Sequence, residues 1–147
     1  MSHKSPVSTH FELHPQLAND TQPIAHLPLC DVLLMDDANH PWLILVPRVP
    51  AAVEIVDLTD EAQATLMHEI AVASRALQAA FKPDKINVAA LGNLVPQLHL
   101  HHVARFSTDK AWPGPIWGAH PAIPYQAQDL RQQADNWRAR LATLGGF

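Results

Sequence analysis

The chain has 147 residues, enough for one domain built around one hydrophobic core. Hydrophobic residues make up 48% of it and charged residues 16%, a balance that excludes an intrinsically disordered chain. The formal net charge of -4 leaves no excess of Lys and Arg to neutralise a nucleic-acid backbone, so we expect no nucleic-acid partner.

The first elements in chain order are short. Residues 11–19 favour a helix of one or two turns, limited by Pro15, and residues 24–27 favour a short extended piece. Residues 30–35 form an apolar run that ends in a polar turn, and residues 42–46 form a second apolar run. Two such runs joined by a short polar turn predict an antiparallel hairpin.

The clearest element is a helix over residues 60–81, which Thr59 can cap and Pro83 follows. Apolar residues recur in it at intervals of three and four, which predicts one buried stripe formed by Leu66, Ile70, Ala73 and Leu77. Residues 85–91 then predict a strand.

The last third of the chain begins with a turn at Gly92-Asn93 and a strand over residues 97–106. Residues 112–124 are rich in Pro and Trp, have no period, and predict an ordered loop. Residues 126–144 predict a final helix with one apolar side, which Gly145-Gly146 would stop; that side carries Leu130, Trp137 and Leu141. Antiparallel strands with two long helices define an α+β fold.

The strand over residues 97–106 has two unlike faces, because alternate side chains of a strand share a face. The even-numbered face is mostly apolar and suits packing under helices; it comprises Leu98, Leu100, His102, Ala104 and Phe106. The odd-numbered face places an amide, two imidazoles and a guanidinium in a row, through Gln97, His99, His101, Val103 and Arg105.

The odd-numbered face has the groups that phosphoryl-type transfer needs. A neutral imidazole at His99 has a nitrogen lone pair that can attack phosphorus, and Arg105 can bind phosphate oxygens. Two other interpretations remain open. The histidines can simply decorate a polar sheet face, or alternate histidines can ligate zinc or copper if His40 or Asp109 joins them through the fold. Cys30 is the only cysteine, which excludes a multi-cysteine zinc site. Of these interpretations we rank metal binding last, and we expect no metal and no cofactor.

The stretch from Leu91 to Arg105 resembles the signature strand of the histidine-triad (HIT) superfamily. The signature is His-φ-His-φ-His-φ-φ, where φ is apolar, often preceded by a Gly-Asn turn and followed by Pro-Arg. The resemblance continues upstream through the hairpin and the long helix, so it covers residues 22–118.

Membership would imply a half-barrel of five antiparallel strands with two helices, a homodimer, and a nucleotide bound over the histidine strand. It would also imply hydrolysis or transfer at an α-phosphate through a nucleotidyl-histidine intermediate, as in bacterial-type hydrolases of dinucleoside polyphosphates. By this resemblance His99 is the nucleophile, His101 the third triad residue, and Asn93 a neighbour of the phosphates.

The chain departs from the signature at several positions. Gln97 stands at the first triad position, which gives the variant triad Gln-x-His-x-His, and Ala104 replaces the common proline. Pro41-Trp42 stands where many members have Gly-His. A glutamine can hydrogen-bond a phosphate but cannot release a proton as an imidazolium can.

We therefore expect a hydrolase or nucleotidyl transferase for nucleoside phosphates or dinucleoside polyphosphates, with catalytic residues His99, His101 and Gln97. The same three residues, with Asn93 and Arg105, would bind the phosphates. A catalytically weak nucleotide-binding module is the alternative, with Gln97 as a sign of lost catalysis. Residues 42–46 are too few to cross a bilayer and residues 1–6 lack the apolar core of an export signal, so we expect one cytoplasmic domain over residues 1–147 with no membrane partner.

Overall fold

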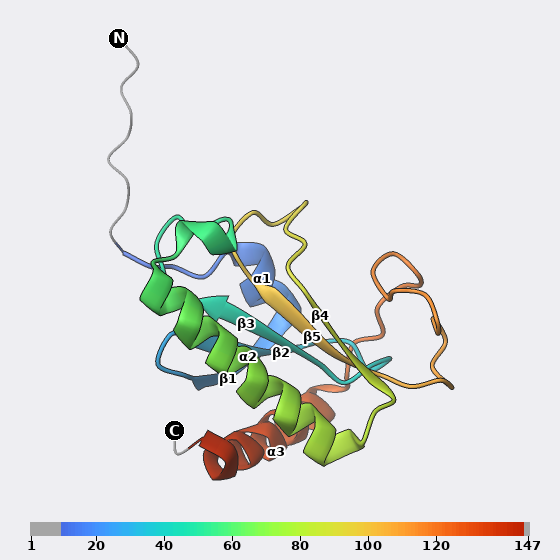
Figure 1. The fold of residues 1–147 in the computed structure, drawn as a ribbon. Coiled ribbons are helices and arrows are strands. Elements are labelled where there is room, and N and C mark those ends of the chain that lie inside the picture. Colours follow the sequence, from blue (N-terminus) through green and yellow to red (C-terminus); the bar gives the residue numbers. More distant parts are fainter. Residues whose placement is uncertain (1–9, 146–147) are drawn as a thin grey trace.

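The protein combines a five-stranded sheet with two long helices in a computed structural model that describes residues 10–145 (Figure 1). In chain order the elements are α1 (Pro15–Asp20), β1 (Thr21–His26), β2 (Cys30–Met35), β3 (Trp42–Pro47), the 3-10 turn η1 (Ile55–Asp57), α2 (Asp60–Phe81), β4 (Lys85–Ala89), β5 (Leu100–Arg105) and α3 (Ala127–Gly145). The predicted α+β class is confirmed. None of the described helices is long and apolar enough to span a membrane.

The strands form one open antiparallel sheet in the order β1-β2-β3-β5-β4. The predicted hairpin is β2 and β3, in which Cys30 pairs with Pro47 and Leu34 with Leu43. β5 enters the sheet between β3 and β4, so His101 pairs with Ile44 on one side and with Ala89 on the other. The pairing with β3 makes neighbours of two segments that are more than fifty residues apart in the chain.

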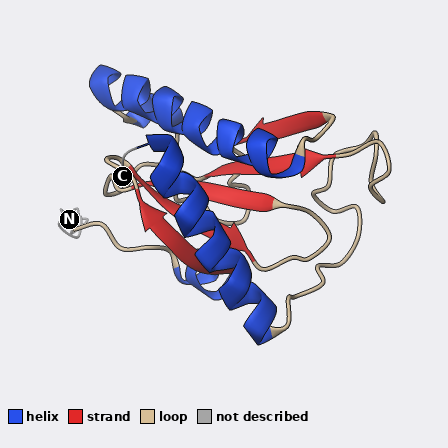
Figure 2. Cartoon of the chain, turned by 90° about the horizontal axis from the view of Figure 1, so that it is seen from below, coloured by secondary structure: helices blue, strands red, loops and turns tan. Residues whose placement is uncertain are grey.

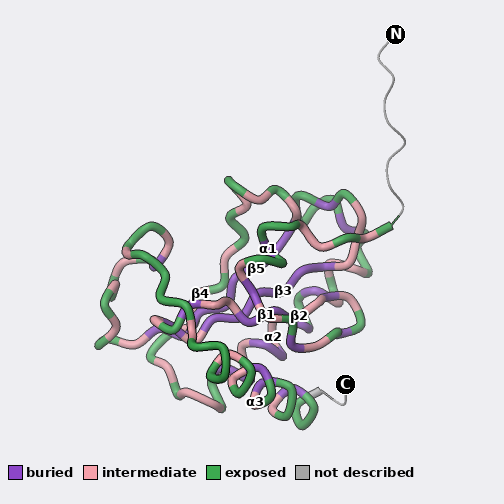
Figure 3. Tube along the Cα trace, turned by 180° about the vertical axis from the view of Figure 1, so that it is seen from behind, coloured by how far each residue is buried: buried purple, intermediate pink, exposed green. Residues whose placement is uncertain are grey.

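The two long helices cover one face of this sheet (Figure 2). α2 packs on β5, β3 and β4, while α3 packs on β1 and against α2. Alternate residues of the central strands, such as Val32, Leu43 and Leu100, enter the core under these helices. The intervening residues, such as Ile44 and Val103, enter a second apolar cluster on the opposite face. The central strands are therefore buried on both sides (Figure 3).

α2 has the bounds that the sequence predicts. The Thr59 hydroxyl accepts a hydrogen bond from the Ala62 amide at its start, and Lys82 ends it in a left-handed conformation. Leu66, Ala73 and Leu77 of the predicted stripe are buried. In α3, Trp137 and Leu141 are likewise buried against the same core.

Several predicted boundaries are wrong. β5 begins at Leu100, not at residue 97, and β4 ends at Ala89, because the paired ladders end at Leu45↔Leu100 and Ala89↔His101. The first helix starts only at Pro15, after the His14 side chain caps it. α3 runs through Gly145, and Gly146, like residues 1–9, lies outside the described part of the chain.

A buried carboxylate joins the helical layer to the sheet. Glu69 of α2 is 0% exposed and accepts hydrogen bonds from the backbone amides of Leu29 at 3.0 Å and Cys30 at 2.8 Å. The Leu29 amide belongs to the turn between β1 and β2, and the Cys30 amide is that of the first residue of β2. The Glu69 carboxylate therefore accepts hydrogen bonds from two backbone N–H groups that have no partner in the sheet ladder.

We expect Glu69→Gln to lower the free energy of unfolding by about 1–3 kcal/mol, because one acceptor oxygen is replaced by an amide that faces a buried N–H group. Urea denaturation measures the change. Glu61→Gln, on the exposed first turn of the same helix, is the control and should have a smaller effect. Equal effects of the two variants would contradict the assigned role of Glu69.

Candidate active site

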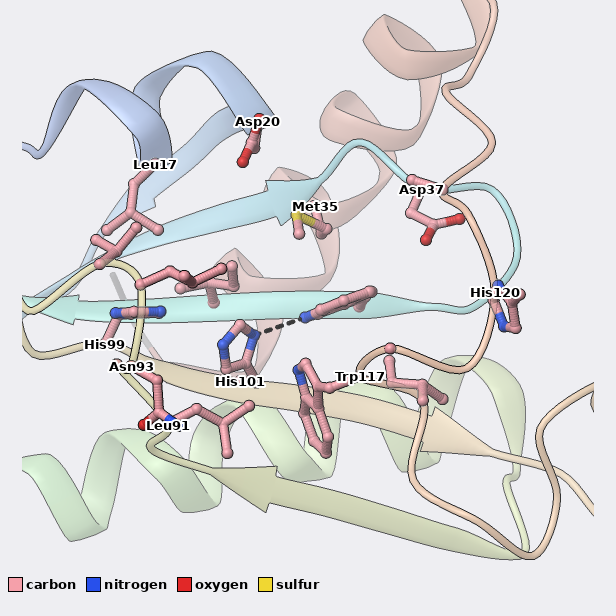
Figure 4. A pocket seen from close by; sticks show the side chains of 18 residues that line it. Leu17, Asp20, Met35, Asp37, Leu91, Asn93, His99, His101, Trp117 and His120 are labelled. Atoms are coloured by element: carbon pink, nitrogen blue, oxygen red, sulfur yellow. Dashed lines mark hydrogen bonds between the residues drawn. The ribbon is translucent and has the colours of Figure 1, made fainter.

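A cavity of about 410 Å³ opens on the face of the sheet opposite the two long helices (Figure 4). Its floor is formed by side chains of β3 and β5, including Trp42, Ile44 and His101. The loop from Leu91 to Val95 and the segment from Ile116 to Ala122 supply opposite walls. The volume lies within the range of about 300–1,000 Å³ that is typical of small-molecule sites.

His99 lies in this cavity just before β5 and is only 6% exposed. Its Nδ1 is 2.7 Å from the backbone carbonyl oxygen of Gln97. Because a carbonyl oxygen only accepts, Nδ1 is the protonated nitrogen and donates this hydrogen bond. In the neutral ring the lone pair is therefore on Nε2, for which the described residues offer no hydrogen-bond partner.

His101 has the opposite arrangement. Trp42 Nε1 lies 3.0 Å from His101 Nδ1, and an indole N–H only donates, so Nδ1 accepts and Nε2 carries the hydrogen. Burial, with smaller contributions from His99 and His102, lowers the pKa of His101 to about 3. The ring is therefore neutral at physiological pH. The cavity thus holds one imidazole with a free lone pair and one with an N–H donor, at a centroid separation of 4.9 Å.

Asn93 reaches the cavity from the loop between β4 and β5. Gly92 before it has φ +73°, a conformation that favours glycine, and lets the loop turn over His99. Of the five predicted site residues, the structure brings His99, His101 and Asn93 together around one cavity.

Gln97 does not lie in the cavity with His99 and His101, contrary to the expectation from strand alternation. It precedes the strand, so strand alternation does not apply, and it is not among the residues that line the cavity. Its Oε1 accepts from the His14 amide at 2.9 Å, and its Nε2 donates to the Glu12 carbonyl at 2.9 Å. The side-chain amide of Gln97 thus joins the segment before α1 to the residues that precede β5.

Arg105 is likewise not among the residues that line the cavity. It is 2% exposed, and its guanidinium donates to both carboxylate oxygens of Asp109, to Asn87 Oδ1 and to the Gly114 carbonyl. These partners occupy each of its three nitrogens. The expectation that Arg105 binds phosphate is therefore not supported; it anchors the loop that follows β5.

His102 faces the helices, as strand alternation predicts. It is 0% exposed, and Nδ1 donates to the Leu100 carbonyl at 3.1 Å. Burial lowers its pKa to about 4. His102 is therefore a neutral core residue and has no access to a ligand.

Three further residues of the cavity wall were not among the predicted site residues. Trp117 and His120 come from the long loop after β5, and Asp37 comes from the β2–β3 turn. The His120 and His40 rings stack, with their Nε2 atoms 3.0 Å apart. No spacing in the sequence links these positions; only the strand register brings the turn and the loop together.

The lining shows what kind of ligand the cavity suits. Among the residues that line it there is no Lys or Arg, whereas Asp20 and Asp37 supply carboxylates on the side away from Asn93 (Figure 4). Within residues 10–145, no group of three or more His, Cys, Asp and Glu side chains is arranged to hold a metal ion. The arrangement offers an imidazole with an available nitrogen lone pair, neutral N–H donors and carboxylate acceptors.

Comparisons with known proteins agree with this geometry. The HIT domain family model matches residues 16–108. A histidine triad protein from Bradyrhizobium japonicum is 49% identical, with a TM-score of 0.86 over 90% of this chain and 98% of that one. Histidine triad proteins from Marinobacter aquaeolei VT8 (46%, TM-score 0.88, 92% and 99% covered) and Sinorhizobium meliloti 1021 (41%, 0.84, 91% and 96%) are similar. No curated protein matches the sequence.

The Arg105–Asp109 pair makes a pH-dependent contribution to stability that can be measured. Hydrogen bonds from Arg105 hold the pKa of the Asp109 carboxyl well below its usual range. Stability from such a group is complete above the unfolded pKa of about 3.9 and is lost as the pH falls. The gap in unfolding free energy between wild type and Asp109→Asn should narrow by about 1 kcal/mol from pH 6 to pH 3. Asp135→Asn, in an exposed pair with Arg138, is the control and should show little change at either pH; a constant gap for Asp109→Asn would contradict the assignment.

Proposed function

This chain belongs to the HIT domain family, whose members generally bind nucleotides and act as hydrolases or transferases, and on that premise we propose a specific reaction for it. His99 attacks the α-phosphate of a nucleoside phosphate or dinucleoside polyphosphate, forms a nucleotidyl-histidine, and releases the nucleotide to water.

The observation that carries this proposal is the hydrogen bond from His99 Nδ1 to the Gln97 carbonyl. It directs the lone pair to Nε2 within a cavity that fits a small ligand. His102 makes the same kind of bond to a backbone carbonyl within the core. His99 differs from it because its ring lines the cavity, beside a second imidazole and an asparagine amide. The Gln97 carbonyl also stabilises the positive charge that the His99 ring acquires when Nε2 bonds to phosphorus.

The proposed reaction has two steps. In the first, the Nε2 lone pair forms a bond to the α-phosphorus while the bond to the leaving-group oxygen breaks, and that oxygen departs with the electron pair. In the second, a water oxygen attacks phosphorus, the phosphorus–nitrogen bond breaks, and His99 recovers its lone pair while the water proton is released. Both steps are in-line displacements that depend on positioning and charge stabilisation.

Neutral donors hold the phosphoryl group in this proposal. The Nε2–H of His101 and the Asn93 amide are the donors that line the cavity near His99. Asp37 lies at the other end, where its carboxylate can accept from the ribose hydroxyls of a bound nucleotide. Because no Lys or Arg lines the cavity, its affinity for phosphate should depend on hydrogen-bond geometry more than on net charge.

Two observations favour substrates with good leaving groups. The Gln97 amide is neutral and tied to the segment before α1, and His101 is neutral, so neither supplies a proton to a departing amine. A nucleotide or pyrophosphate can leave as an anion without that proton. Dinucleoside polyphosphates and nucleoside polyphosphates are therefore the substrate class we assign.

The same two observations also favour a second candidate, a nucleotide-binding module with weak catalysis. The two candidates differ in what His99 does. An enzyme needs the nucleophile for turnover, whereas a binding module needs only the shape of the cavity and its donors.

We expect the His99→Ala variant to bind a nucleoside monophosphate but to lose at least about 10³-fold in kcat with a dinucleoside polyphosphate, because the covalent route is removed. Rapid quenching of the wild type followed by mass spectrometry should find an acid-labile nucleotide adduct on His99. His68→Ala, an exposed histidine of α2, is the control and should leave both results unchanged.

Undiminished activity in His99→Ala, or an adduct on another residue, would contradict the assignment of the nucleophile. Tight nucleotide binding by the wild type without an adduct or turnover would favour the binding module.

We also propose that the protein is a homodimer. β4 is an edge strand of the sheet, and apolar side chains gather on it and on the loop after it: Val88 is 42% exposed, Leu91 48% and Leu94 96%. An unpaired edge with exposed apolar residues favours pairing with a second copy, which a two-fold axis along β4 and α2 would allow.

Light scattering should give the mass of a dimer at micromolar concentration. Val88→Asp should shift the protein toward monomer, since it places a charge at an exposed apolar position of the edge strand. Leu144→Asp, at an exposed apolar position in the last turn of α3, is the matched control and should leave the dimer intact. A wild-type protein that is monomeric at all concentrations tested would exclude this assembly.

A further inference from the structure

The contact between Trp42 and His101 joins two strands in the floor of the cavity. Trp42 is the first residue of β3 and lies diagonally across from His101, because Trp42 pairs with Val103 and Ile44 with His101. Both side chains are buried, with 7% exposed each. Their nitrogen atoms are 3.0 Å apart, and the rings are tilted at a centroid distance of 5.6 Å (Figure 4).

The chemistry of the two rings fixes the direction of this hydrogen bond. Indole has an N–H and no acceptor, so His101 Nδ1 must be unprotonated. The neutral ring then carries its hydrogen on Nε2. Formation of an imidazolium would place a second N–H on Nδ1, directed at the indole N–H, and two donors would face each other in a buried site.

From this contact we propose that Trp42 is a positioning residue that locks His101 as a permanent Nε2–H donor and prevents it from acting as a proton source. This inference rests on the proposed function for its consequence: His101 would hold a phosphoryl oxygen throughout the reaction but would not protonate a leaving group. Tryptophan at position 42 would thus contribute, together with Gln97, to a preference for leaving groups that depart as anions.

The other titratable groups near His101 do not explain why its neutral ring should hold the proton on Nε2. His99 and His102 are its titratable neighbours along the chain, and His99 meets it edge-on. Asp20, Asp37 and His120 line the same cavity, but no hydrogen bond joins them to His101 among the described residues. Burial alone favours the neutral ring over the charged one, yet it does not choose between the Nδ1–H and Nε2–H forms.

A nearby indole provides a control within the same cavity. Trp117 meets the His101 ring edge-on at a centroid distance of 5.4 Å, and its buried Nε1 has no hydrogen-bond partner among the described residues. Trp117→Phe therefore removes an indole and its N–H beside His101 without removing a hydrogen bond. Trp42→Phe makes the same chemical change and does remove one.

The test is nuclear magnetic resonance of the full chain labelled with ¹⁵N-histidine. Long-range ¹H–¹⁵N correlations distinguish the two neutral tautomers and the imidazolium of each ring. In the wild type, His101 should show the Nε2–H form alone and should not titrate between pH 5 and 8. In Trp42→Phe, the ratio of the Nε2–H form to the Nδ1–H form of His101 should fall about five- to tenfold, which is the equivalent of one lost hydrogen bond. Trp117→Phe should leave the ratio as in the wild type.

Because Trp42→Phe also removes volume, benzothienylalanine at position 42 serves as a second variant: it keeps the bicyclic shape and replaces N–H with sulphur. It should reproduce the tautomer change of Trp42→Phe. A wild-type His101 in the Nδ1–H form, a His101 that titrates between pH 5 and 8, or an unchanged ratio in both position-42 variants would overturn the proposal. The wild-type spectra alone test it if neither variant folds.

Kinetics then separate this inference from the proposed function. With a dinucleoside polyphosphate, Trp42→Phe should lower kcat more than it changes KM, because only a fraction of the molecules present the donor. Tautomer changes as expected without turnover in the wild type would reject the proposed function and leave the role of Trp42 intact. Turnover with a His99 adduct and an unchanged tautomer ratio in the position-42 variants would reject the role of Trp42 alone.

Discussion

The site depends on one structural constraint: β5 is paired on both edges and buried on both faces. Each side chain of β5 points to one face of the sheet or the other, and the pairing with β3 and β4 fixes its position along the sheet. His102 therefore enters the helical core, and His101 enters the opposite face, where the cavity lies. The two long helices make this possible because they fill one side of the sheet and leave the other to a loop and a short helix.

Within that frame, the chemistry of each imidazole follows from its hydrogen-bond partner. A carbonyl oxygen accepts from His99 Nδ1, and an indole N–H donates to His101 Nδ1, so adjacent rings expose opposite functions to the cavity. One presents a lone pair and the other an N–H. Burial keeps His101 neutral. Two identical side chains thus present a lone pair and an N–H donor, without a Lys or Arg in the cavity lining.

Several charged side chains lie outside the cavity and hold in place the segments that form it. Arg105 and Asp109 form a buried pair that anchors the loop after β5, and this loop carries Trp117 and His120 to the cavity wall. Glu69 links α2 to the turn before β2 in a similar way. Trp117 and His120 lie beyond residue 108, where the match to the family model ends.

The sequence by itself determined the elements that have a strong local pattern, which are α2 with its Thr59 cap and the β2–β3 hairpin. It also determined that the even-numbered face of β5 packs under the helices. It also singled out His99, His101 and Asn93. Only the tertiary structure decided the roles of Gln97 and Arg105, because the strand starts three residues later than its pattern and both side chains find partners distant in the sequence or in the following loop. Trp42 gained its role in the same way, since cross-strand register depends on packing that no local pattern encodes.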